Sequence, residues 1–153
     1  MIRTALSVVC AVAIASGAAA QAPPSHLTEL VAKARLNGVV ADWCRGEFGS
    51  GHAEAFAVAL RATPDSGRYL ILEENATVTE LAAFAYGAEL QCLSRAEAEQ
   101  RDLAIRETGT VAGHITPRFN TSVVCGFVTN TEAVCWQYSP IDRAFARVGG
   151  WMT

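Results

Sequence analysis

Hydrophobic residues recur at helical spacing near the amino end of the chain. Between residues 27 and 43 the positions that fit one face of a helix are Leu27, Leu30, Val31, Ala34, Val39 and Val40. Ser25 or Thr28 could cap the start, and Gly38 marks a point where the helix could stop or kink. We therefore expect a long helix over residues 27–43, followed by a glycine-rich loop over residues 45–52.

The next region has a period of two, which is typical of strands. Large and small apolar residues alternate over residues 55–60, a β-prone run covers residues 69–72, and alternation returns over residues 77–84. Turn-forming residues separate the three runs. The alanines of residues 54–60 would also suit a helix, but Phe56, Val58 and Leu60 line one face of a strand. The pattern favours a three-stranded antiparallel meander.

A second helix is expected over residues 95–106. Ser94 and Glu97 have the spacing of a capping box. In this motif the serine hydroxyl accepts the backbone N–H of Glu97, and the glutamate carboxylate accepts the backbone N–H of Ser94. Strong helix formers follow, and most of them are polar. This helix should lie on the surface of the protein.

The last third of the chain returns to short strands, expected at residues 111–115, 123–128, 133–138 and 144–148. The second and third of these flank a turn with Asn130 near its tip, where an asparagine can adopt a positive φ. A three-residue loop centred on Asn130 places Cys125 opposite Cys135, at a separation that a disulfide accepts. A two-residue turn would instead place Cys125 opposite Trp136 and prevent that bond unless a β-bulge shifted the register.

Together these elements predict one α+β domain over residues 21–153. It would combine the amino-terminal helix, a mainly antiparallel sheet of about six or seven strands, and the inserted surface helix. The 133 residues that remain after residue 20 are enough for one core and too few for two domains.

Residues 1–20 have the layout of a secretory signal peptide. Arg3 supplies a positive start, residues 5–16 are almost wholly apolar, and Ala18–Ala20 forms a small-residue cleavage site before Gln21. The apolar run is too short for a permanent membrane span. A lipoprotein anchor at Cys10 is rejected because Val9 stands where a small residue is needed. We expect a periplasmic or secreted protein.

Four cysteines remain after cleavage, and an even number in a secreted domain predicts two disulfides. None lies in a Cys-x-x-Cys motif, so neither a redox centre nor a zinc knuckle is indicated. The hairpin favours Cys125–Cys135, which leaves Cys44–Cys92 to tie the end of the first helix to the segment before the second.

The charge distribution gives no sign of nucleic-acid binding. The formal charge of −3 becomes −4 when Arg3 is lost, and the arginines are scattered rather than gathered in a basic patch. Eleven arginines against one lysine, Lys33, are typical of a GC-rich genome, which together with the short signal indicates a bacterial source.

No catalytic, cofactor or metal site is predicted by a recognisable motif. His52 and His114, with Asp42 or Glu47, could complete an open zinc site, but no metal-binding spacing supports one. His26 falls in the proline-bearing leader and is set aside. The alternative function is therefore a small hydrolase or metalloenzyme that uses His52 and His114.

Two other groups of reactive residue types are better explained without catalysis. Ser50 lies beside His52 among glycines, but side chains so close in sequence rarely form a triad, and no Gly-x-Ser-x-Gly motif is present. Glu73 and Glu74 are adjacent, and adjacent strand residues point to opposite faces, so they cannot flank one glycosidic bond.

Aromatic residues are dense near the carboxyl end. Trp136, Tyr138 and Arg143 could form a binding face for a sugar or peptide, although burial of the large aromatic residues in the core is favoured. We expect a non-catalytic binding or accessory protein, of which an inhibitor is one form. It would bind an envelope or extracellular macromolecule or a small ligand. No cofactor, nucleic acid or membrane span after cleavage is expected.

Overall fold

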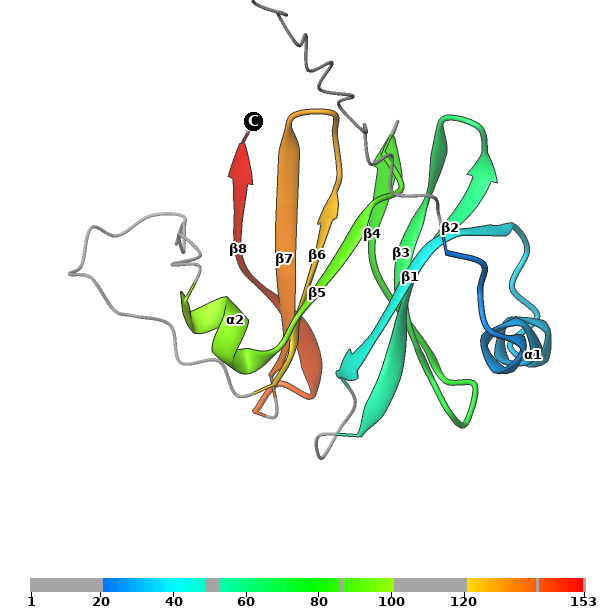
Figure 1. Ribbon diagram of the computed structural model, residues 1–153, viewed down its shortest axis with the longest axis horizontal. Helices are drawn as coiled ribbons and strands as arrows, with labels where there is room; N and C mark the ends of the chain where they lie inside the picture. The colour runs from blue at the N-terminus through cyan, green and yellow to red at the C-terminus, as the bar shows by residue number, and fades with distance from the viewer. Residues whose placement is uncertain (1–20, 49–52, 86, 101–120, 140, 153) are drawn as a thin grey trace, which may run out of the picture.

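Two antiparallel sheets of four strands form the framework of the protein. A computed structural model describes residues 21–48, 53–85, 87–100, 121–139 and 141–152, and this part of the chain contains eight strands and two short helices (Figure 1). The elements are α1 (Ser25–Lys33), β1 (Val39–Glu47), β2 (Glu54–Thr63), β3 (Ser66–Glu73), β4 (Val78–Ala85), β5 (Leu90–Leu93), α2 (Arg95–Gln100), β6 (Val123–Phe127), β7 (Glu132–Ser139) and β8 (Ala144–Met152). Each sheet is a meander whose spatial order follows the chain.

The mainly antiparallel character and the two disulfides are as predicted, but the single sheet of six or seven strands is wrong. The described strands divide into one sheet of β1–β4 and another of β5–β8. Alternation along a strand reports which faces are buried, and it does not report which strands share a sheet. The predicted strand over residues 111–115 lies outside the described residues.

The expected helix over residues 27–43 is also wrong in its second half. α1 ends at Lys33, and the chain then turns through Arg35 and Gly38, whose φ angles are 54° and 136°. Residues 39–47 form β1, which pairs with β2 along its whole length and so extends into the segment expected to be a loop. Neither Ser25 nor Thr28 caps the helix, because Pro24 occupies the cap position.

The three-stranded meander of residues 54–84 is confirmed as β2, β3 and β4, and residues 54–60 are strand rather than helix. Phe56, Val58 and Leu60 do share one buried face. That face is covered by α1, whose Leu27 and Leu30 are buried against it.

The hairpin of β6 and β7 has the predicted register. Cys125 lies opposite Cys135, and Val128 donates its N–H to the carbonyl oxygen of Glu132 across a three-residue loop (2.9 Å). Asn130 does not have the positive φ expected of it; among the described non-glycine residues only Arg35, Ala76 and Arg143 do.

The capping box of α2 is confirmed. The N–H of Ser94 donates to a carboxylate oxygen of Glu97 (2.8 Å), and the N–H of Glu97 donates to the hydroxyl of Ser94 (3.3 Å). The helix is mostly exposed and buries Ala98 on the outer face of the second sheet. Residues 101–106 of the predicted helix lie outside the described part.

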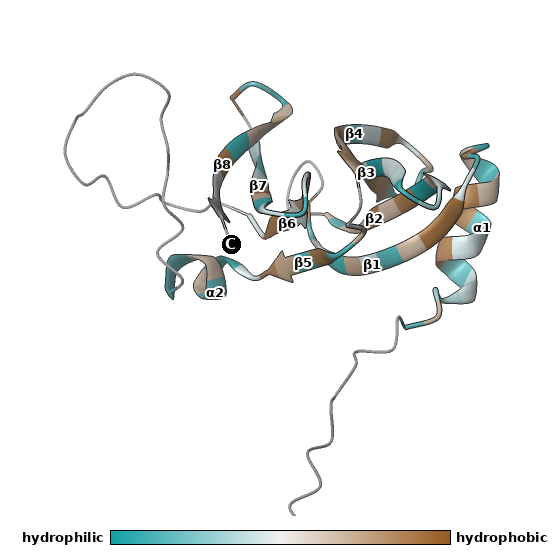
Figure 2. Cartoon of the chain, turned by 90° about the horizontal axis from the view of Figure 1, so that it is seen from above, coloured by the Kyte–Doolittle hydropathy of each residue, from teal (hydrophilic) through white to brown (hydrophobic). Residues whose placement is uncertain are grey.

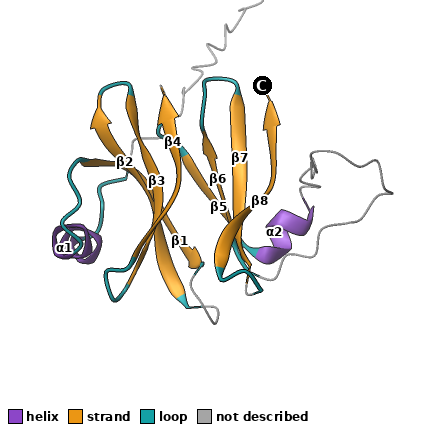
Figure 3. Cartoon of the chain, turned by 180° about the vertical axis from the view of Figure 1, so that it is seen from behind, coloured by secondary structure: helices purple, strands orange, loops and turns teal. Residues whose placement is uncertain are grey.

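The layers therefore run from α1 through the two sheets to α2. Figure 3 shows the helices on opposite outer faces, and Figure 2 shows the strands of both sheets around the space between them. The core that the sheets share is rich in aromatic side chains and includes Phe48, Tyr69, Phe84 and Trp136.

Tyr69 connects the two sheets through its hydroxyl group. From β3, this hydroxyl donates to the main-chain oxygen of Phe127 (2.8 Å), and the oxygen of Glu89 lies 3.3 Å away. The ring rests on Gly126 of β6, where an added Cβ would lie only 2.8 Å from ring carbons. Desolvation by burial raises the pKa of Tyr69 above its ordinary value.

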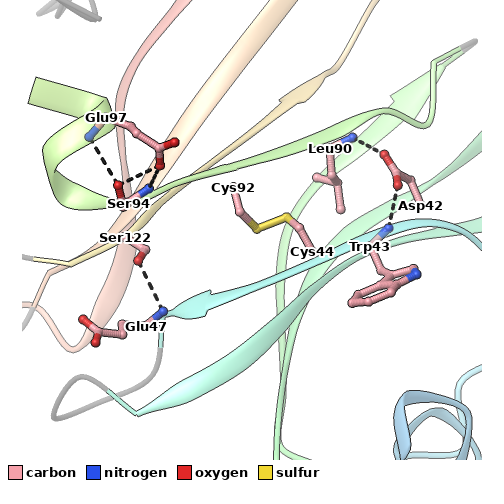
Figure 4. The surroundings of a disulfide bond; sticks show 9 residues. All are labelled: Asp42, Trp43, Cys44, Glu47, Leu90, Cys92, Ser94, Glu97 and Ser122. Carbon is pink, nitrogen blue, oxygen red and sulfur yellow. Dashed lines mark hydrogen bonds between the residues drawn. A yellow bond between two sulfur atoms is a disulfide. The ribbon is translucent and has the colours of Figure 1, made fainter. Parts of the chain in front are cut away.

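The two sheets meet along β1 and β5, which run in the same direction (Figure 4). The disulfide Cys44–Cys92 joins the strands, with Cα atoms 5.8 Å apart. Two residues earlier on each strand, the carboxylate of Asp42 accepts the N–H of Leu90 (2.7 Å) with one oxygen and that of Trp43 (2.8 Å) with the other. Side chains therefore hold this seam together where no ladder is formed.

Candidate binding surfaces

Four charged or titratable side chains gather on the outer face of the first sheet. Glu74, in the β3–β4 turn, contacts His26 of α1 at 2.5 Å and Arg45 of β1 at 3.6 Å. Arg45 also pairs with Glu54 of β2 at 2.7 Å. The guanidinium lies over the ring of Phe56, 5.4 Å from its centroid.

This cluster is suited to docking α1 rather than to catalysis. Each of its ion-paired side chains is about half exposed, and pairs of that kind contribute little individually. His26 also packs near Phe56, with ring centroids 6.1 Å apart, so its ring links the helix to the sheet. The described residues contain no group of three or more His, Cys, Asp or Glu arranged to hold a metal ion.

The sequence alone does not predict this cluster, because nothing in it places His26 and Glu74 close together. Their contact spans 48 positions of the chain, and it depends on where α1 docks. The contact could be recognised only after α1, which carries His26, and the β3–β4 turn, which carries Glu74, had both been placed.

Most of the residues singled out for an enzyme fall where the structure gives no description, so their arrangement is not tested. Ser50, His52 and His114 lie outside it. Asp42 uses both carboxylate oxygens on backbone amides at the seam, and Glu47 has an exposed side chain and an N–H that donates to the hydroxyl of Ser122 (3.3 Å).

Of the three residues suggested as a binding face, Trp136 is in the core. It is 6% exposed and packs beside Tyr69 between the sheets, because its position on β7 points toward the first sheet. Core packing, the favoured explanation from the sequence, therefore holds for Trp136. Tyr138 is half buried nearer the end of the same strand and meets Phe145 of β8 edge-on. Arg143 is exposed in the turn beyond them.

The β7–β8 turn presents an isoleucine to solvent. Ile141 is 92% exposed. The hydroxyl of Ser139 donates to the carboxylate of Asp142 (2.7 Å), and the N–H of Asp142 donates back to that hydroxyl (3.3 Å), which links the two ends of the turn. Arg143 follows with a φ of 51°, a left-handed conformation that costs a non-glycine residue free energy.

A hollow on the outer face of the second sheet is close to the lower size limit of small-molecule sites. Its volume is about 280 Å³, and its lining consists of Glu89, Leu90, Gln91, Cys125, Gly126, Phe127 and Ala133. Pockets for drug-sized ligands usually occupy roughly 300–1,000 Å³ and bring together several polar groups. The hairpin end is the stronger candidate for recognition.

Comparison of the chain with models of protein families, with curated proteins and with solved structures found no match. The two disulfides are compatible with an oxidising or extracellular compartment. Within the described residues, no helix has the length and apolar character needed to cross a membrane.

Proposed function

We propose that the protein is exported to the periplasm or exterior of a bacterium after loss of residues 1–20, and acts there as a non-catalytic binding or accessory protein. Its partner is a second protein, and inhibition of that partner is one form the role could take. The two disulfides and the layout of residues 1–20 support export.

The observation that carries the binding role is the exposed Ile141 on a hydrogen-bonded turn. Hydrogen bonds that join the ends of a turn reduce the conformational freedom lost on binding, and an isoleucine buried in a partner contributes about 1.5–3 kcal/mol. The partner would offer an apolar pocket for Ile141 and a carboxylate for the neighbouring Arg143. Tyr138 and Phe145 would form the edge of the contact.

The strained backbone at Arg143 supports the same surface. A residue that needs a left-handed φ is most easily supplied as glycine, so an arginine there retains a cost of about 1–2 kcal/mol. Strained backbone of this kind clusters at functional sites.

The test is quantitative capture of partners from the periplasm or culture fluid of the source organism by the wild-type protein and two variants. Ile141→Ser removes the proposed anchor, and Val39→Ser is its matched control, because Val39 is 70% exposed on the first sheet. We expect a partner that is retained by Val39→Ser and bound about tenfold more weakly by Ile141→Ser. Equal capture by all three proteins would refute the proposed surface.

A further inference from the structure

The first described residue is held against the outer face of the first sheet. Trp43 of β1 donates its indole N–H to the main-chain oxygen of Gln21 at 3.1 Å. Three residues later, the main-chain oxygen of Pro24 accepts the N–H of Thr28 at 3.1 Å and so opens α1. Residues 21–24 therefore tie the start of the helix to β1.

Cleavage after Ala20 would turn Gln21 into an amino-terminal glutamine. An α-amine and a side-chain amide on the same residue can close a five-membered ring. Gln21 is exposed, and its hydrogen bond with Trp43 engages only the carbonyl oxygen, which takes no part in that closure. Ring closure therefore does not consume the oxygen atom that Trp43 binds.

We propose that Gln21 is a modification site, which cyclises to pyroglutamate in the exported protein. The α-nitrogen forms a bond to the side-chain carbonyl carbon, the bond from that carbon to the amide nitrogen breaks, and ammonia leaves with the proton given up by the amine. No oxidant or cofactor is needed. The inference rests on the proposed export, since it requires cleavage between Ala20 and Gln21.

Closing the ring would also protect α1 from trimming. Aminopeptidases need a free α-amine, and a compartment outside the cytoplasm exposes the terminus to them. Loss of residues 21–24 would remove both the oxygen that Trp43 binds and the one that opens the helix. Leu27, which is completely buried on the first sheet, follows only three residues after Pro24.

The test is the intact mass of freshly exported protein, with Gln21→Asn as the matched variant that does not close this ring readily. We expect the wild-type chain to be about 17 Da lighter than residues 21–153 with both disulfides closed, the mass of one ammonia, and the variant to show no such loss. A chain that begins at Gln21 with a free amine would overturn the modification and leave export standing. A different first residue would overturn the proposed cleavage, and the modification with it.

An aminopeptidase digest gives a second measurement. The Gln21→Asn protein should lose residue 21, while the wild-type protein should keep residue 21 until a pyroglutamyl peptidase removes it. Trimming of the wild-type protein without that pretreatment would contradict the proposal.

Discussion

Replacing Tyr69 by Phe removes one hydroxyl group from the space between the sheets. The ring and its packing against Phe84 and Trp136 remain, so the change reports the hydrogen bond that the hydroxyl donates to the main-chain oxygen of Phe127. A buried bond of this kind contributes about 0.5–1.5 kcal/mol net, and an acceptor left without a donor adds to the loss. We expect Tyr69→Phe to lower the free energy of unfolding by about 1.5 kcal/mol at pH 7.

The pH dependence of this difference has a definite sign. Burial raises the pKa of Tyr69 in the folded protein, while the unfolded chain releases the proton near pH 10. Above that pH the unfolded state binds fewer protons than the folded state, so stability falls as the pH rises. The loss reaches about 1.4 kcal/mol at one pH unit above 10, and it is absent from the phenylalanine variant.

The wild type is more stable than Tyr69→Phe by about 1.5 kcal/mol at pH 7 and loses about 1.4 kcal/mol by pH 11. The two proteins should therefore become equally stable near pH 11. Urea unfolding followed by tryptophan fluorescence, at several pH values from 7 to 11, measures the difference. Tyr138→Phe, at a half-buried position, is the control, with an expected change below about 0.5 kcal/mol at pH 7. A Tyr69→Phe difference that stayed constant over the whole range would refute the reasoning.

Three further predictions concern the packing of the layers, each measured by reversible urea unfolding. Gly126→Ala should destabilise the protein by about 1–3 kcal/mol, because the new methyl group meets the ring of Tyr69, and an unchanged midpoint would contradict that contact. Leu27→Ala should cost about 2–3 kcal/mol if α1 is docked as described. Replacing Cys44 and Cys92 by serine should cost about 4 kcal/mol, and replacing Cys125 and Cys135 about 3 kcal/mol, because the Cys44–Cys92 bond closes the longer loop. The reverse order would count against the loop-entropy account.

The parts of the fold that were predictable are those set by neighbours in the sequence. The alternation over residues 55–60 and the turn around Asn130 specify strand faces and a hairpin register, and that register leads directly to the Cys125–Cys135 bond. The Cys44–Cys92 pairing then followed by elimination. The expected location of Cys44 was wrong, because this residue lies within β1 and not at the end of a helix.

The errors arise where distant segments decide the structure. Val39 and Val40 fit both a helical stripe and a strand, and pairing with Arg61 and Leu60 of β2 selects the strand. The contact between His26 and Glu74 likewise depends on where α1 docks. For the proposed binding surface, the sequence pointed to Tyr138 and Arg143 but not to Ile141, because exposure at a turn is a property of the assembled hairpin.

The seam between β1 and β5 determines what happens when the backbone is cut between β4 and β5. Each sheet is built from one continuous half of the chain, and the described residues contain a single main-chain hydrogen bond between the sheets, from Ala85 N–H to the oxygen of Val128. A peptidase that cleaved this connection would leave each meander whole, with Cys44 on one fragment and Cys92 on the other. The nicked protein would remain one covalent molecule until a reductant separated its halves.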